Sequence, residues 1–394
     1  MKFYHRIRTK LAFAFLLVTL IPAITIGLYS MSVSSQSLLN QELNAQSQRV
    51  HAVKQSIESF LGSARGDVSF LGSAEPLSRY LSLRGAGDSP DAVEQARRAL
   101  EKEFMAFSIS REIYYQVRYL DETGQEVVRV DSDGVQTKIV AKDRLQNKAK
   151  RYYFADAVDL PLGSIMVSPL DLNREHGKVE VPHKPVIRYA VPVHYADGRK
   201  AGVVLTNIDA KRFLADMGGV MLLDKNGYFL SSPDPTKAWG SKRDLDTGAD
   251  YREDFGAETA QILNSDKGSI ENPNDITTYQ KVSIPGSMDQ WVLVLKRPKG
   301  EVLASVTEFR NTFMAILAGA LLVSLILALI LDARITKPIE YLTAEAERVS
   351  TGDLMNPVEV DDEGEIGQLA EAFERMRVSM VRMMDRMQKR RSRS

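Results

Sequence analysis

The 394-residue sequence contains no cysteine, so no disulfide bond stabilises any part of this chain. This absence is compatible with a location outside the cytoplasm but gives no evidence for one. The formal charge is balanced, with 51 lysines and arginines against 51 aspartates and glutamates. Because nucleic-acid-binding proteins usually carry a basic excess, we expect no nucleic-acid partner.

The sequence also lacks the short motifs that mark common catalytic sites. It contains no Walker loop, no G-x-S-x-G, no H-E-x-x-H and no kinase or cyclase signature. Three histidines and two glutamates between residues 175 and 194 are irregularly spaced around prolines, so they do not predict a metal site. We therefore expect no enzymatic activity, no metal and no cofactor. An outward-facing hydrolase, the alternative, requires a catalytic triad or metal cluster that the sequence does not show.

Charged residues are absent from two long apolar runs, residues 11–33 and 312–331. A bilayer core about 30 Å thick takes about twenty apolar residues as a helix, so each run predicts a membrane-spanning helix. A cleavable signal peptide is the alternative for the first run, although such peptides usually have a shorter apolar stretch. A buried core helix is the alternative for the second run, although that run has no polar stripe.

Basic residues that flank the two runs predict the orientation in the membrane. Four lysines and arginines precede the first run, none occurs in residues 34–47, and Arg334 and Lys337 follow the second run. Because basic flanks remain in the cytoplasm, both termini are expected inside and the long middle segment outside. The predicted location is the inner (cytoplasmic) membrane, with the middle segment periplasmic or extracellular.

The middle segment contains a loosely repeated pattern of strands and turns. A strand, a D-x-x-G turn and a second strand occur in residues 117–130 and again in residues 220–231. Each half closes with another pair of strand-like runs, in residues 186–207 and 276–296. Apolar residues spaced by three and four from residue 50 to residue 71 predict a long helix in front of them. Two antiparallel-sheet modules in series are expected, and one large sandwich is the alternative.

The long helix and paired modules make the segment similar to the double-Cache sensors of bacterial chemoreceptors and histidine kinases, whose modules are PAS-like antiparallel sheets. In that family small ligands usually occupy the membrane-distal module, and amino-acid-binding members share the motif R-x-W-Y-x-x-A. The run from Arg151 to Ala157 is similar, with Tyr153 for Trp and Phe154 for Tyr. Asn207 stands where the family has an acidic residue. Because an α-amino group normally needs that carboxylate, this departure from the family pattern does not favour an ordinary amino acid as the ligand.

Further polar residues extend this candidate ligand site. The run from Ser168 to Arg174 is polar within an apolar region, and Arg188 begins the next strand. We expect a polar or anionic small molecule, with Arg151 or Arg188 as the bidentate partner of a carboxylate. For any single residue, turn formation or surface solvation is the alternative. The candidate ligand-binding residues are Arg151, Tyr153, Phe154, Asp171, Asn173, Arg188 and Asn207.

The segment after the second apolar run is similar to HAMP signal-transmission modules. A series of apolar residues spaced by three and four ends before Gly352-Asp-Leu354, and a second such series begins at Glu365-Ile-Gly367. Helices this short do not bury their apolar seams alone, so a parallel four-helix bundle in a homodimer is expected.

These observations predict an α+β chain with two transmembrane helices, tandem PAS-like (double-Cache) modules on a long helix, and a C-terminal HAMP coiled coil. We expect a homodimeric membrane receptor that binds a small solute outside and signals to a cytoplasmic protein in trans. The alternative is the N-terminal part of a histidine kinase, diguanylate cyclase or methyl-accepting chemotaxis protein. The predicted segments are the cytoplasmic N-terminus 1–10, transmembrane helix 11–33, juxtamembrane helix 34–75, membrane-distal module 76–215, membrane-proximal module 216–300, connecting helix 301–311, transmembrane helix 312–331, HAMP domain 332–385 and basic tail 386–394.

Overall fold

The computed structural model describes residues 7–175, 177–359 and 364–391. Residues 1–6 and 392–394 of the predicted cytoplasmic ends, and His176 of the histidine group, lie outside the described residues. The chain divides into two compact units. We call Leu39–Val302 the sheet unit, and Met1–Leu38 together with Leu303–Ser394 the helical unit.

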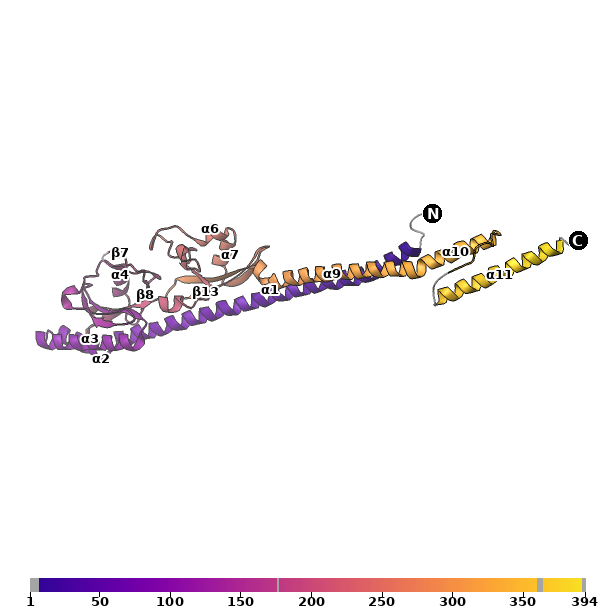
Figure 1. Ribbon diagram of the computed structural model, residues 1–394. Helices are drawn as coiled ribbons and strands as arrows, with labels where there is room; N and C mark the ends of the chain where they lie inside the picture. Colours follow the sequence, from indigo (N-terminus) through magenta and orange to yellow (C-terminus); the bar gives the residue numbers. More distant parts are fainter. Residues whose placement is uncertain (1–6, 176, 360–363, 392–394) are drawn as a thin grey trace. The chain divides into compact units, whose positions relative to one another are not determined.

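The helical unit contains two helices that are long and apolar enough to cross a membrane. They are the first part of α1 (Ile7–Gly72) and α9 (Ala304–Leu331), drawn in indigo and orange in Figure 1. Their large apolar side chains are exposed, among them Ile26 and Ile316, which suits contact with lipid. The hydroxyl oxygens of Thr19 and Ser324 lie 3.2 Å apart, so a polar contact joins the two helices.

A short helical pair follows α9 along the chain. A π-helical turn, η4 (Asp332–Thr336), leads into α10 (Lys337–Ser350), and α11 (Glu365–Arg391) comes after a connector. Gly352 ends the first helix with a φ of 95°, a conformation that glycine adopts without strain. Leu342, Val358 and Ala370 form a small buried cluster that joins both helices to the connector.

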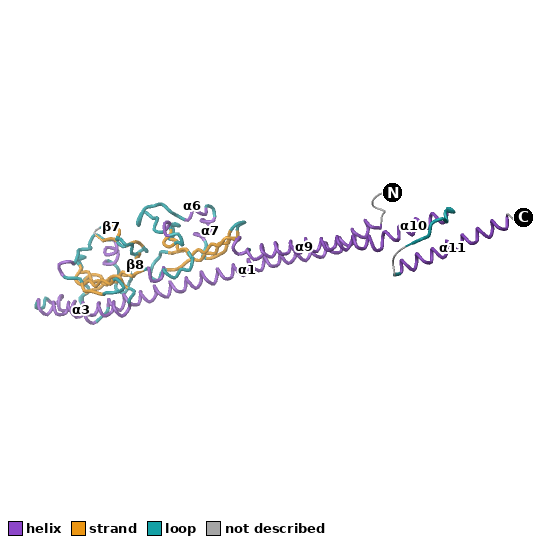
Figure 2. The backbone as a smooth tube through the Cα atoms, in the orientation of Figure 1, coloured by secondary structure: helices purple, strands orange, loops and turns teal. Residues whose placement is uncertain are grey.

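The sheet unit carries two large antiparallel sheets and a separate two-stranded one, β6-β7, and strands occur only in this unit among the described residues (Figure 2). The seven-stranded sheet, in the first module, has the order β3-β2-β1-β9-β8-β4, with β5 also paired to β8. Its strands are β1 (Tyr114–Asp121), β2 (Glu126–Ser132), β3 (Thr137–Ile139), β4 (Met166–Val167), β5 (Asp171–Leu172), β8 (Pro185–His194) and β9 (Lys200–Asp209). The short connecting elements are η2 (Lys142–Arg144), α4 (Tyr152–Val158), β6 (Arg174–Glu175), β7 (Lys178–Val179) and α5 (Lys211–Leu214).

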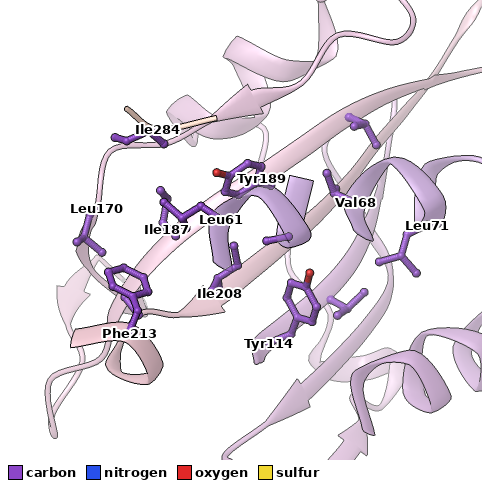
Figure 3. Close-up of a cluster of buried hydrophobic side chains, with 14 of the residues drawn as sticks. Leu61, Val68, Leu71, Tyr114, Leu170, Ile187, Tyr189, Ile208, Phe213 and Ile284 are labelled. Atoms are coloured by element: carbon purple, nitrogen blue, oxygen red, sulfur yellow. The ribbon is translucent and has the colours of Figure 1, made fainter. Parts of the chain in front are cut away.

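One face of the seven-stranded sheet packs against helices. Leu61, Val68 and Leu71 of α1 meet Tyr189 of β8 and Ile208 of β9 in the main apolar core (Figure 3). Two further helices, α2 (Glu75–Ala86) and α3 (Pro90–Arg111), contribute to the same core. The apolar spacing in α1 therefore faces a sheet, and the opposite face of that sheet is left to α4 and to polar residues.

The second module is built on a five-stranded sheet with the order β11-β10-β14-β13-β12. Its elements are β10 (Met221–Leu223), β11 (Phe229–Ser231), η3 (Pro235–Lys237), α6 (Tyr251–Phe255), α7 (Glu258–Asn264), β12 (Lys267–Glu271), β13 (Asp275–Ser283), β14 (Gln290–Pro298) and α8 (Lys299–Val302). Mixed helix and antiparallel sheet, with two sheets in series, confirms the predicted fold class.

Both D-x-x-G turns form by the expected chemistry. The Asp121 carboxylate accepts the Thr123 N–H at 2.9 Å, and Gly124 has a φ of 79°. In the second module the Asp224 carboxylate accepts the Asn226 N–H at 2.8 Å, and Gly227 has a φ of 93°. Aspartate thus satisfies the turn backbone while glycine supplies the positive φ.

Candidate functional site

Strand register brings polar side chains together on the α4 face of the first sheet. Asn207 of β9 is paired with Gln116 of β1 on one side and with Arg188 of β8 on the other. All three are nearly inaccessible to solvent. Asn207 donates to the Gln116 side-chain oxygen at 3.0 Å, so a polar row crosses three strands.

Arg118 lies at the centre of this polar face and is only 2% exposed. Its guanidinium donates to the Asn207 amide oxygen at 2.8 Å and lies 3.4 Å from a Glu126 carboxylate oxygen. Tyr153 of α4 covers it, with the guanidinium carbon 5.5 Å from the ring centroid. The guanidinium carbons of Arg188 and Arg151 lie 5.3 and 5.7 Å from the same centroid. Three guanidinium groups therefore surround one aromatic ring.

The cations change the acidity of the Tyr153 phenol. Burial by itself raises its pKa, but the charges of Arg118, Lys148 and Arg188 outweigh burial, and the net pKa lies below the usual tyrosine value. Tyr119, a buried tyrosine of β1, has a raised pKa because burial dominates there. The surroundings of Tyr153 thus favour negative charge although they are buried.

Two further cations and two carboxylates complete the interior network. Arg129 pairs with Asp131 at 2.8 Å, with Glu175 at 3.3 Å and with Glu126 at 3.7 Å. Lys148 lies 3.9 Å from Glu175, and burial lowers the pKa of its amine. Glu126 and Glu175 are each shared between two cations, and Asp131 pairs with Arg129, so the network has no surplus negative charge.

A cavity of about 440 Å³ opens beside this network, within the range of small-molecule sites. Arg188 reaches it from β8, donating to Asp171 at 2.7 Å, while Tyr152 donates to the other Asp171 oxygen at 3.2 Å. Six cationic side chains and one carboxylate line this space. The lining residues are Lys150, Arg151, Tyr152, Asp171, Leu172, Arg174, Arg188, Lys242 and Arg243.

The structure distributes the seven predicted ligand residues over three places. Arg151, Asp171 and Arg188 line the cavity. Tyr153, Asn173 and Asn207 lie in the buried layer: Asn173 accepts from Arg188 at 3.2 Å, and Asn207 accepts from Arg118. Phe154 packs in an apolar cluster between α4 and the sheet. Their role in ligand contact remains a prediction.

Several residues of the site were not among those predicted. Arg118 and Arg129 are cations inside strands, and a charge within an apolar strand is a signal the sequence already contained. Lys150 stands next to Arg151, but Lys242 and Arg243 belong to the second module. No sequence pattern connects them to the first module, because only the fold brings the two segments to one cavity.

The arrangement is suited to binding an anion. Guanidinium groups offer paired N–H donors that fit carboxylate and phosphoryl oxygens. Within the described residues, no group of three or more potential metal ligands is close enough to hold an ion.

Comparison with known proteins agrees with this architecture. The family model described as bacterial histidine kinase, sensor domain, matches residues 88–294, and the HAMP domain model matches residues 333–382. Neither matched domain is catalytic. Two membrane-spanning helices flank a sensor domain of the extracellular type, which confirms the predicted inner-membrane receptor.

Curated relatives include bacterial receptors. The methyl-accepting chemotaxis protein McpA of Bacillus subtilis is 20% identical over 384 residues, which cover 95% of this chain and 51% of McpA. The heme sensor protein HssS of Staphylococcus haemolyticus is 35% identical over 120 residues, which cover 30% of this chain and 25% of HssS. The chain therefore spans about half the length of McpA.

Solved structures share the fold. A domain described as part of a sensory box/GGDEF family protein from Vibrio parahaemolyticus has a TM-score of 0.60 at 16% identity, covering 67% of this chain and 99% of that one. An extracellular domain described as that of a histidine kinase has a TM-score of 0.59 at 17% identity, covering 72% of this chain and 99% of that one.

Proposed function

Since this chain belongs to the bacterial histidine kinase sensor-domain family, and is a transmembrane receptor with a HAMP domain, we propose that it binds a small anionic solute in the cavity beside Arg188. The observation that carries the proposal is the charge of the lining, six cations against one carboxylate that is already paired. A cleft with one sign of charge concentrates ligands of the other sign. The solute then contacts the first module, where the resemblance to double-Cache sensors also implies a ligand.

The test is a thermal-shift screen of the full chain in nanodiscs against anionic metabolites, because a ligand of the folded form raises the melting temperature. Arg151→Ala removes a half-exposed lining cation that makes no ion pair with any described residue, so the fold should persist. We expect the shift to shrink in this variant. Arg144→Ala, which removes an exposed cation outside the cavity, is the matched control. An undiminished shift in Arg151→Ala contradicts the site.

We further propose that the HAMP domain transmits the signal as a homodimer. The apolar seam of α11 is exposed in the single chain, including Met376, Met380 and Met383. A second copy would bury this seam in a parallel bundle.

Because the sequence has no cysteine, single introduced cysteines report on this contact without background. Met380→Cys should form a disulfide-linked dimer in membranes, whereas Arg382→Cys, on the opposite face of α11, should not. Equal cross-linking of both variants would show collision in place of a specific bundle.

The receptor acts on a cytoplasmic output. A partner in trans is the first candidate. An output domain in the same polypeptide is the second, and the chain's coverage of half of McpA supports it. Sequencing the coding region downstream of the Ser394 codon distinguishes the two: an in-frame signalling domain supports the second candidate, and a stop codon beside a signalling gene supports the first.

A further inference from the structure

One loop of the second module extends to the first. We call residues 239–248, between η3 and α6, the bridging loop. Its Asp244 carboxylate accepts the Leu172 backbone N–H of β5 at 2.8 Å. Arg174 donates to the Arg243 carbonyl at 2.8 Å and lies 3.4 Å from the Asp244 carbonyl. The bridging loop is thus hydrogen-bonded to the same strand that carries Asp171, the partner of Arg188.

The bridging loop is also held by its own hydrogen bonds. Ser241 donates to the second Asp244 oxygen at 2.7 Å, and the Leu245 N–H donates to the Trp239 carbonyl at 3.0 Å. Trp239 and Asp246 have positive φ values of 65° and 55°, which non-glycine residues rarely adopt. Such conformations persist where surrounding contacts fix the backbone. The backbone on both sides of Lys242 and Arg243 is therefore set by the fold.

Lys242 and Arg243 form a second cationic wall of the cavity. The first wall, from the first module, consists of Lys150, Arg151 and Arg188. Of these five cations only Arg188 has an ion-pair partner among the residues that the structure describes. The backbone of the bridging loop makes the contacts to the first module, so the side chains of Lys242 and Arg243 are exposed and available to a ligand.

We propose that the natural ligand carries two separated anionic groups and bridges the two modules. One group pairs with Arg151 and Arg188, and the other pairs with Lys242 and Arg243. This inference rests on the proposed anion site and adds the ligand class. A ligand with one anionic group neutralises one wall and leaves the two cations of the other facing it. Dicarboxylates and diphosphoryl compounds share the required chemistry.

Bridging also gives occupancy a mechanical consequence. A ligand that contacts both walls favours the arrangement in which the bridging loop is hydrogen-bonded to the first module, and the bridging loop is continuous with the second module. A ligand held by the first module alone has the same affinity for any arrangement of the two modules. A ligand with equal affinity for two states does not shift the equilibrium between them.

The experiment measures binding of two anion pairs to the full chain in nanodiscs by calorimetry. Succinate is compared with butyrate, which has the same carbon chain and one carboxylate fewer, and pyrophosphate is compared with phosphate. The variants are Lys242→Ala/Arg243→Ala and the control Lys138→Ala/Arg144→Ala, which removes two exposed cations outside the cavity. Emission of Trp239, in a Trp291→Phe background, is a second readout, because these are the only two tryptophans in the sequence.

In one of the two pairs, we expect the anion with two anionic groups (here called bivalent) to bind the wild type roughly 10- to 100-fold more tightly than the anion with one such group (monovalent). In Lys242→Ala/Arg243→Ala this preference should fall to about twofold or less, with binding of the monovalent anion retained. The bivalent anion alone should change Trp239 emission. Whichever pair shows the preference identifies the ligand as carboxylate or phosphoryl.

The outcomes separate the two proposals. If none of the four anions binds the wild type, the anion site itself is wrong. If the anions bind but valence makes no difference, or if the preference survives in Lys242→Ala/Arg243→Ala, the anion site stands and bridging is wrong. Loss of preference in the control variant as well would assign the effect to net charge and also overturn bridging.

Discussion

Replacing Asp171 by asparagine separates the structural role of the Arg188 pair from its effect on the ligand. The side chains of Arg188 and Asp171 are 3% and 8% exposed, and their contact is 2.7 Å. Removing one charge of a buried pair destabilises a protein by about 3–5 kcal/mol. Asparagine preserves the shape, and Asn173 still accepts from Arg188, so we take the lower value, about 3 kcal/mol.

This loss corresponds to a measurable change in melting temperature. For the roughly 260 residues of the sheet unit, an unfolding entropy of about 2.1 cal/mol/K per residue gives about 0.55 kcal/mol/K. The expected fall is therefore about 5 °C, followed by far-ultraviolet circular dichroism of the full chain in nanodiscs. The control is Asp197→Asn, whose pair with Arg199 is exposed (51% and 66%) and should contribute less than about 1 kcal/mol.

The same substitution should strengthen anion binding. Asp171 is the only carboxylate among the residues that line the cavity, and it repels an incoming anion. At an effective dielectric constant of about 20 and a separation of about 5 Å, two unit charges interact by about 3 kcal/mol. With about half of this lost to solvent screening, the affinity for pyrophosphate should rise about tenfold. An unchanged melting temperature would refute the buried-pair argument, and weaker binding would refute the competition between Asp171 and the ligand.

Three other predictions follow from single contacts. As the pH is raised, the Tyr153 phenol should ionise below the usual tyrosine range, and Tyr153→Phe should abolish this step in the phenolate absorbance. Because the pKa of Tyr153 is lower in the folded state, its ionisation stabilises the fold above the unfolded-state pKa of 10.0, and this contribution is lost as the pH falls through the folded-state pKa. Asp244→Ala should lower the free energy of unfolding by about 1–3 kcal/mol in a denaturant titration, because the Leu172 N–H loses its acceptor. Asp244→Asn should leave it nearly unchanged, because asparagine retains an acceptor and removes a carboxylate whose pKa burial raises. Equal losses in the two variants would contradict this distinction. Gly202→Ala should lower the melting temperature by several degrees, because φ is 132° and a Cβ would lie 2.0 Å from the Leu120 carbonyl oxygen. Gly198→Ala should lower it less, because the space around Gly198 is open although its φ is 83°. The reverse order would show that backbone φ matters more than this clash.

Much of the architecture follows from local patterns in the sequence. The two charge-free runs predict contact with lipid because they have no polar face. The structure leaves both runs exposed, on α1 and on α9. The D-x-x-G turns need only residues within four positions of one another, so they form as expected. The apolar seams of α10 and α11 have the same local origin, as has the stripe of α1 that faces the first sheet.

The site could be predicted only in part. Arg151, Asp171 and Arg188 were predicted because they lie near a motif and a polar run, and the structure brings them to one cavity; their contact with a ligand stays a prediction. Phe154 was included from the motif, and it packs in an apolar cluster that also contains its neighbour Tyr153, so its contact with a ligand stays a prediction. Arg118 was missed because its partners, Glu126 and Asn207, come from other strands.

The sequence by itself determined the order of parts: lipid-spanning helix, two sheet modules, second span and HAMP pair. It did so because hydrophobic periodicity and turn chemistry act over short distances along the chain. Only the tertiary structure decided what the cavity is made of. Lys242 and Arg243 follow Arg188 by more than fifty positions and belong to a loop of the second module. Strand register and the hydrogen bond from Leu172 to Asp244 set them opposite the arginines of the first module. The charge of a site depends on which residues are neighbours in space, and the order of residues along the chain does not give those neighbours.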